Sequence, residues 1–148
     1  MKMLNIFAED NRLEKISKLG DHLEKLNASI EWGIFEEPLK DALKKEHKGA
    51  GGRPPYDYVL MFKILILQRL YNLSDDQTEY QINDRMSFMR FLGLSISERM
   101  PDAKTIWLFR EKLVQAECIK SLFELFYQEL ETKNIVTHEG TIVDATFV

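Results

Sequence analysis

The sequence has one cysteine, few prolines and glycines, and no long hydrophobic run. Since Cys118 has no second thiol to pair with, an internal disulfide is excluded, which fits the reducing cytoplasm. Four prolines, seven glycines and the lack of a low-complexity tract argue against extensive disorder. Lys63 interrupts the apolar segment 58–67, which falls far short of the ~20 residues of a membrane span, and no signal peptide is evident. We expect a cytoplasmic protein with no membrane partner.

An excess of positive charge is also missing. The formal net charge is −4 at pH 7, whereas a general nucleic-acid binder is expected to be basic. Any contact with DNA must therefore depend on a local patch. With 45% hydrophobic and 30% charged residues, the 148-residue chain has a globular composition that suits one domain, or one domain plus part of another.

Apolar residues recur at steps of three and four over residues 12–32, which predicts one amphipathic helix with a kink near Gly20. The stripe consists of Leu13, Ile16, Leu19, Leu23, Leu26 and Ile30. It could pack against its own domain. Alternatively, Leu19, Leu23 and Leu26 could form a short heptad seam between two copies of the chain.

The segment KKEHKGAGGRPPYD, residues 44–57, must interrupt regular structure after a helix expected over residues 38–45. It has three glycines in four residues and a Pro-Pro pair. Between residues 40 and 55, five basic residues stand against two acidic ones, a local positive excess in an acidic chain. This exposed loop could contact DNA, or its lysines could serve only to keep it soluble.

The segment DYVLMFKILILQRLYN is apolar nearly all round, which predicts a helix at the centre of a bundle. Ser74 and Gln77 form a capping-box pattern at the start of the next helix, and Gly93 ends a short helix after it. A last helix is expected over residues 117–132. These features predict a mainly helical protein.

The segment AKTIWLFREKL, which follows Pro101 and Asp102, predicts a helix with two different faces. Its inner stripe is Ile106, Phe109 and Leu113, while Lys104, Arg110 and Lys112 lie largely away from that stripe. Short helices followed by a helix with outward bases are typical of a helix-turn-helix arrangement, although any small bundle has such neighbours.

The character of the sequence changes after residue 134, where β-branched and apolar residues without helical period predict strand structure. In GTIVDATFV, residues 140–148, alternation places Asp144 on a mostly apolar face. A carboxylate there is costly unless it is paired, protonated or bound to a metal; otherwise Asp144 lies on an edge strand or faces solvent. We expect this strand to be unpaired and poorly anchored.

Four segments together resemble the DDE transposases of bacterial insertion sequences, specifically the IS-five group with its InsH-type N-terminal domain. They are RLEKISKLGDHLEKLN, GGRPPYDYVLMFKILILQRLYNLSDDQTEYQINDRMSFMRFLGL, PDAKTIWLFREKL and GTIVDATFV, in this order over nearly the whole chain. The resemblance implies a helical, DNA-binding bundle over residues 1–134, with a helix-turn-helix-like segment and an exposed basic loop at 44–57. It also implies that residues 135–148 are the first β-strand of a truncated catalytic domain of RNase H-like fold.

The resemblance further implies metal-dependent DNA cleavage and strand transfer. Asp144 matches the first of three catalytic acids that would hold two divalent ions, for which Mg²⁺ is suited. The sequence ends four residues later, before the other two acids. We therefore expect this chain alone to be inactive and to bind no cofactor. A truncated gene, the first frame of a frameshifted pair and a fragment of a longer protein all stay open.

The resemblance implies that the helical region recognises the terminal inverted repeats of double-stranded DNA, in a nucleoid-associated protein. The first candidates for DNA contact are Lys104, Arg110 and Lys112, with Thr105 reaching a phosphate, followed by Lys44, Lys45, Lys48 and Arg53. One alternative is a module that forms homodimers or inhibits full-length transposase. Another is a folded remnant without present function.

Overall fold

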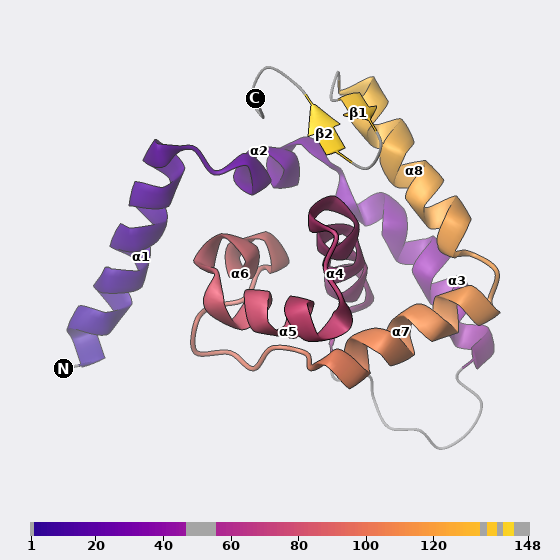
Figure 1. Cartoon of the computed structure of the whole chain (residues 1–148), viewed down its shortest axis with the longest axis horizontal. Coiled ribbons are helices and arrows are strands. Elements are labelled where there is room, and N and C mark those ends of the chain that lie inside the picture. Colours follow the sequence, from indigo (N-terminus) through magenta and orange to yellow (C-terminus); the bar gives the residue numbers. More distant parts are fainter. Residues whose placement is uncertain (1, 47–55, 134–135, 139–140, 144–148) are drawn as a thin grey trace.

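The computed structural model describes residues 2–46, 56–133, 136–138 and 141–143. The helices are α1 (Lys2–Leu19), α2 (His22–Ser29), the 3-10 helix η1 (Trp32–Phe35), α3 (Glu36–Glu46), α4 (Tyr58–Tyr71), α5 (Asp75–Asp84), α6 (Met86–Leu92), α7 (Ala103–Gln115) and α8 (Ile119–Thr132). The strands β1 (Val136–His138) and β2 (Thr141–Val143) follow. Figure 1 shows most helices gathered around α4, with α1 extending away from them. The predicted mainly helical bundle is confirmed.

Helix α4 lies at the centre of the bundle, as its apolar sequence predicts. The Asp57 carboxylate caps it by accepting a hydrogen bond from the Leu60 backbone N at 3.1 Å. Six of its fourteen residues are buried: Met61, Phe62, Ile64, Leu65, Ile66 and Leu67. Helices α3, α5, α6 and α7 all pack against it. In the described part of the chain, no helix is both long and apolar enough to cross a membrane.

One cation lies half-buried beside this core. The Lys63 Nζ donates to Asn27 Oδ1 and to the Phe91 carbonyl oxygen, each at 2.9 Å, and lies 4.6 Å from the centre of the Trp32 ring. These contacts join α2, η1, α4 and α6. Burial lowers the pKa of Lys63 from 10.5 to about 8, against a smaller opposing effect of the Asp57 charge. The side chain is therefore still charged at neutral pH, where oxygens and a ring face stabilise it.

The single helix predicted over residues 12–32 is wrong, because the chain breaks after α1. Gly20 has a φ of +107°, a value that favours glycine. The next residue, Asp21, starts α2 by accepting a hydrogen bond from the Leu23 backbone N at 3.0 Å. The expected kink near Gly20 is thus a complete helix boundary.

The predicted leucine seam is wrong for the same reason. Leu23 and Leu26 are 3% and 0% exposed in the core of their own chain, whereas Leu19, at the end of α1, is 79% exposed. Because the break separates Leu19 from the other two, the three side chains share no surface that a second copy could contact.

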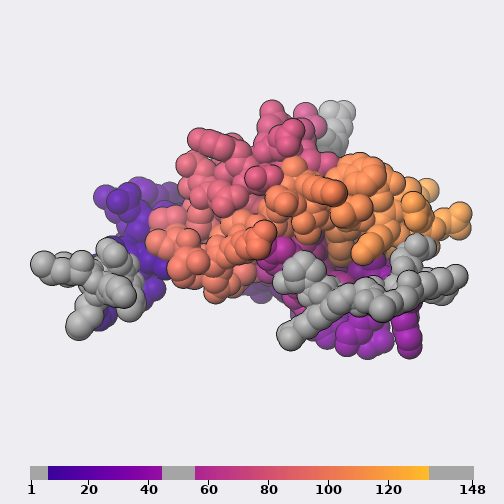
Figure 2. Space-filling model, turned by 90° about the horizontal axis from the view of Figure 1, so that it is seen from below, coloured from indigo at the N-terminus to yellow at the C-terminus, as the bar shows by residue number. Residues whose placement is uncertain are grey.

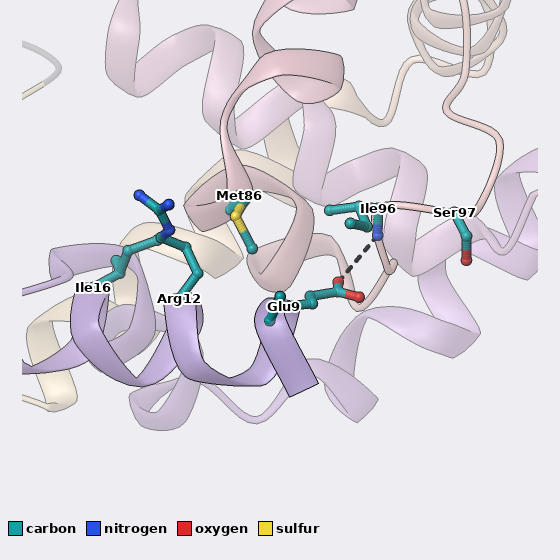
Figure 3. A pocket seen from close by; sticks show the side chains of 7 residues that line it. Glu9, Arg12, Ile16, Met86, Ile96 and Ser97 are labelled. Carbon is teal, nitrogen blue, oxygen red and sulfur yellow. Dashed lines mark hydrogen bonds between the residues drawn. The ribbon is translucent and has the colours of Figure 1, made fainter. Parts of the chain in front are cut away.

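Helix α1 is attached to α6 and to the segment after it by polar contacts. Arg90 of α6 donates to the Ser17 hydroxyl at 2.9 Å and pairs with Asp21 at 2.7 Å. Glu9 accepts a hydrogen bond from the Ile96 backbone N at 3.1 Å (Figure 3). An open hollow of about 790 Å³ lies between α1 and the part of the chain that holds α6 and the segment after it. It is lined by Ala8, Glu9, Arg12, Ile16, Met86, Ile96 and Ser97. No predicted site residue lines this hollow.

The boundaries of α5 and α6 confirm the sequence signals. The Ser74 hydroxyl accepts from the Gln77 backbone N at 3.1 Å, and the Gln77 side chain accepts from the Ser74 backbone N at 2.9 Å. Gly93, with φ +77°, ends α6. Arg85 alone separates α5 from α6, whereas residues 93–102 separate α6 from α7, which packs against α5. A tight turn therefore precedes α6, whereas a ten-residue segment precedes α7.

Strands β1 and β2 form an antiparallel hairpin, with Val136 opposite Val143 and His138 opposite Thr141. The expectation of an unpaired strand is wrong for Thr141–Val143, because β1 supplies its hydrogen-bonding partner. The predicted end of this strand, including Asp144, lies outside the described residues.

We expect Lys63→Met to change how stability depends on pH. In the wild type, folding lowers the pKa of Lys63, so between about pH 8 and 10.5 the unfolded chain binds more protons and stability rises with pH. After discounting for partial exposure, the wild type should gain roughly 1–2 kcal/mol relative to the variant across this window. Urea unfolding of the wild type and of Lys63→Met at several pH values measures the difference in unfolding free energy. A difference that does not change with pH would contradict a lowered pKa of Lys63.

Candidate nucleic-acid interface

Helix α7 is positioned by polar contacts at its first turn. The Asp102 carboxylate accepts a hydrogen bond from the Thr105 backbone N at 2.8 Å, and hydrogen bonds from Thr105 hold the pKa of Asp102 below its usual range. The Ala103 backbone N donates to Glu79 Oε1 of α5 at 2.7 Å. Its inner face is then fixed by Ile106, Phe109 and Leu113, all of them buried as predicted. The opposite face consequently points outward.

The outward face of α7 combines positive charge with exposed apolar surface. Lys104 and Lys112 are both exposed, as the sequence predicts. Trp107 and Leu108 lie between them in sequence and are 47% and 42% exposed. Glu111 is the acidic residue of this helix and is half-buried. Figure 2, viewed from below the orientation of Figure 1, shows α7 on the face turned toward the reader.

Arg110, predicted as a DNA contact, is engaged within the protein. Its Nη1 and Nη2 donate to Asp75 Oδ1 and Oδ2, each at 2.7 Å, and Nη1 also donates to Gln68 Oε1 at 3.1 Å. The hydrogen bonds from Arg110 lower the pKa of Asp75, and the same bonds raise the pKa of Arg110. The two-pronged pair ties α7 to α4 and α5. Arg110 therefore contributes little free positive charge to the surface.

Thr105 is half-buried beside the start of α4. It lines an open hollow of about 580 Å³ whose walls also include Asp57, Glu98, Arg99 and Asp102. The hydrogen bonds from Thr105 to Asp102 occupy its polar groups, and the surrounding carboxylates disfavour a phosphate. Thr105 thus lies next to the outward face of α7 but has an evident role in capping.

The basic residues predicted around the loop are only partly described. Lys44 is exposed on α3, and α3 packs against α7. Lys45 belongs to the last turn of α3. Lys48 and Arg53 lie outside the described residues. Both Lys44 and Lys45 therefore belong to a helix adjoining α7, and the described exposure is that of Lys44.

The predicted metal ligand cannot be placed in the same way. Asp144 follows β2 directly and lies outside the described residues. Among the residues that the structure does describe, no three His, Cys, Asp or Glu side chains are grouped so that they could hold a metal ion. The prediction that Asp144 needs two further acids stays a prediction.

Sequence reasoning missed Trp107 and Leu108 as surface residues. Both are hydrophobic, and a hydrophobic residue in a bundle helix is ordinarily assigned to the core. A helical period of 3.6 residues nevertheless separates both of them by roughly a third of a turn from the stripe of Ile106, Phe109 and Leu113. This signal was available, since the three inner positions alone define the buried side.

Asp75→Asn should lower the free energy of unfolding by roughly 1–2 kcal/mol at pH 7, because the partly buried Arg110 loses its charged partner. Folding lowers the pKa of Asp75 below its ordinary value of 3.8. The stabilisation is therefore present above pH 3.8 and is lost as the pH falls through the folded pKa. Urea unfolding from pH 7 down to about pH 3 should show that the difference in unfolding free energy between the wild type and Asp75→Asn becomes smaller.

Asp76→Asn is the matched control, because Asp76 is exposed, lies in the same first turn of α5 and shares the helix-terminus effect. The Asp75–Arg110 pair would not be the source of the stabilisation if both variants lost the same free energy of unfolding. The same holds if the difference between wild type and Asp75→Asn did not depend on pH.

Residues 10–112 of the chain match a known family, the transposase domain DUF772. The matched region starts within α1 and ends within α7 at Lys112, so it includes Lys44, Lys104 and the Asp75–Arg110 pair. No solved structure matches the chain. The match covers well over half of the 148 residues, and membership of this family implies an interaction with DNA in general. The chain therefore belongs to the DUF772 transposase domain family.

Proposed function

We propose that this chain is the N-terminal, DNA-binding portion of an insertion-sequence transposase, and that α7 binds the terminal inverted repeats of its element. The observation that carries the proposal is the outward face of α7. Lys104 and Lys112 are exposed there, whereas Arg110 of the same helix is neutralised by Asp75. The two lysines are thus available for phosphates in a protein that is acidic as a whole.

The surroundings of α7 support a local basic patch. Lys44 adds a third exposed positive charge from the neighbouring helix α3. Within α7 the acid Glu111 is half-buried and therefore partly withdrawn from the outward face, whereas the Asp102 carboxylate at the start of the helix is exposed and caps the first turn. Phosphate contacts of this kind fix a helix on the duplex without carrying sequence information.

The catalytic part of the proposal concerns Asp144. We propose that the β1–β2 hairpin begins a catalytic domain of RNase H-like fold and that Asp144 is the first of three acids for Mg²⁺, as in DDE transposases of the bacterial IS-five group. The short hairpin agrees with a sheet starting here, since two strands alone are marginally stable. Cleavage then requires a second Asp and a Glu, and in their absence no Mg²⁺ is bound. A nucleoid location would follow from DNA binding.

Lys104→Ala combined with Lys112→Ala should weaken binding to a duplex that carries the terminal repeat by on the order of ten-fold, because two phosphate contacts are lost. The slope of log affinity against log salt should fall by about one for each lysine. Fluorescence anisotropy with a labelled repeat duplex and a scrambled duplex of equal composition measures both quantities.

Lys25→Ala is the matched control. Lys25 is an exposed lysine on α2, and Figure 1 shows α2 and α7 on opposite sides of α4. This variant should bind as the wild type does. If repeat and scrambled duplex bind equally, end recognition is excluded; if the double variant binds like Lys25→Ala, the interface is not α7.

A further inference from the structure

The outward face of α7 carries more exposed apolar surface than a phosphate-binding helix needs. Trp107, Leu108 and Val114 are 47%, 42% and 46% exposed, in a helix of thirteen residues. Within the described part of the chain, the Trp107 ring contacts no other aromatic ring and its indole N–H donates no hydrogen bond. Neighbouring apolar side chains left in water on one helix face indicate a binding surface.

Trp107 and Leu108 lie between the two exposed lysines. The charge of these lysines indicates the kind of partner that binds the two apolar side chains. Lys104, Leu108 and Lys112 follow at steps of four and share one row of the helix surface, with Trp107 beside it. Eight residues at 1.5 Å each place the lysines about 12 Å apart along the helix. The major groove is also about 12 Å wide, so the lysines can reach a phosphate on either side while the apolar pair faces the floor.

We propose that Trp107 and Leu108 recognise thymine in the major groove through its C5-methyl group. This inference rests on the proposed DNA binding by α7. The methyl group is the apolar feature that base edges present in this groove, and an indole or isobutyl group can contact it without losing a hydrogen bond. The one polar atom of the Trp107 side chain, its indole nitrogen, can only donate, so it suits the acceptor atom of thymine beside that methyl group.

The other residues on the outward face of α7 favour contact with thymine over hydrogen bonding to guanine. Guanine is commonly read by a two-pronged contact from arginine or lysine, but the arginine of α7, Arg110, is engaged by Asp75, and the proposed function assigns Lys104 and Lys112 to phosphates. Sequence preference at this helix therefore depends on apolar contact, and the preferred sites contain A·T pairs. The lysines supply affinity, and Trp107 and Leu108 supply selectivity.

The test compares the terminal-repeat duplex with the same duplex in which deoxyuridine replaces thymidine, which removes only the methyl groups. The wild type should bind the deoxyuridine duplex about four-fold more weakly for each methyl group contacted. Trp107→Ala with Leu108→Ala should bind both duplexes equally, while Lys104→Ala with Lys112→Ala should bind more weakly yet still distinguish them. Because both apolar side chains are partly exposed, the first variant should stay folded at the temperature of the binding assay, which thermal unfolding checks.

The outcomes separate the two proposals. Equal binding of repeat and scrambled duplex by the wild type overturns the proposed function and this inference together. Preference for the repeat without any effect of deoxyuridine, or of Trp107→Ala with Leu108→Ala, overturns the inference alone. If that variant instead loses a concentration-dependent mass in light scattering and keeps its DNA affinity, the apolar pair is a protein interface, which also overturns the inference.

Discussion

Helix α4 is the constraint on which the rest of the bundle depends, because it has no polar face to leave in water. Helices α3, α5, α6 and α7 pack against it and bury six of its fourteen residues. Lys63 interrupts the apolar part of this helix and is half-buried, and Asn27, the Phe91 carbonyl oxygen and the Trp32 ring contact its ammonium group. The polar residue in the middle of an apolar helix thereby joins α2, η1 and α6 to the centre. Truncating it removes contacts in several elements at once.

Because α7 packs against α4, one side of α7 is buried and the opposite side is left at the surface. Helix α7 places Ile106, Phe109 and Leu113 toward the core, and its flank is held to α5 by Arg110 and Asp75. This ion pair engages the one guanidinium group of α7 in a contact within the protein. The outward surface of α7 consequently consists of two flexible lysines with apolar groups between them, and it lacks the rigid fork of a free arginine.

Sequence patterns predicted the helices well because periodicity, capping and glycine stops are local properties. They failed where distant residues decide the outcome. Arg110 was assigned to the DNA-binding side because its partner, Asp75, lies 35 residues earlier and leaves no trace in the pattern of α7. The break after α1 was underestimated for a different reason: a continuous apolar stripe hid the Gly20-Asp21 pair, which ends one helix and caps the next. The pairing of β2 with β1 likewise depends on contact between separate segments.

The net charge of −4 limits how α7 can act, but less than it first suggests. At physiological ionic strength charges are screened beyond about 8 Å, so acids on α1 and α2 repel a duplex at α7 only weakly. What they do remove is long-range attraction, so association should be unassisted by steering and affinity should depend on close contact. Phosphate contacts weaken as salt rises, whereas apolar contacts with thymine do not. The selectivity that we propose for α7 should therefore persist at salt concentrations where its total affinity for DNA has already fallen.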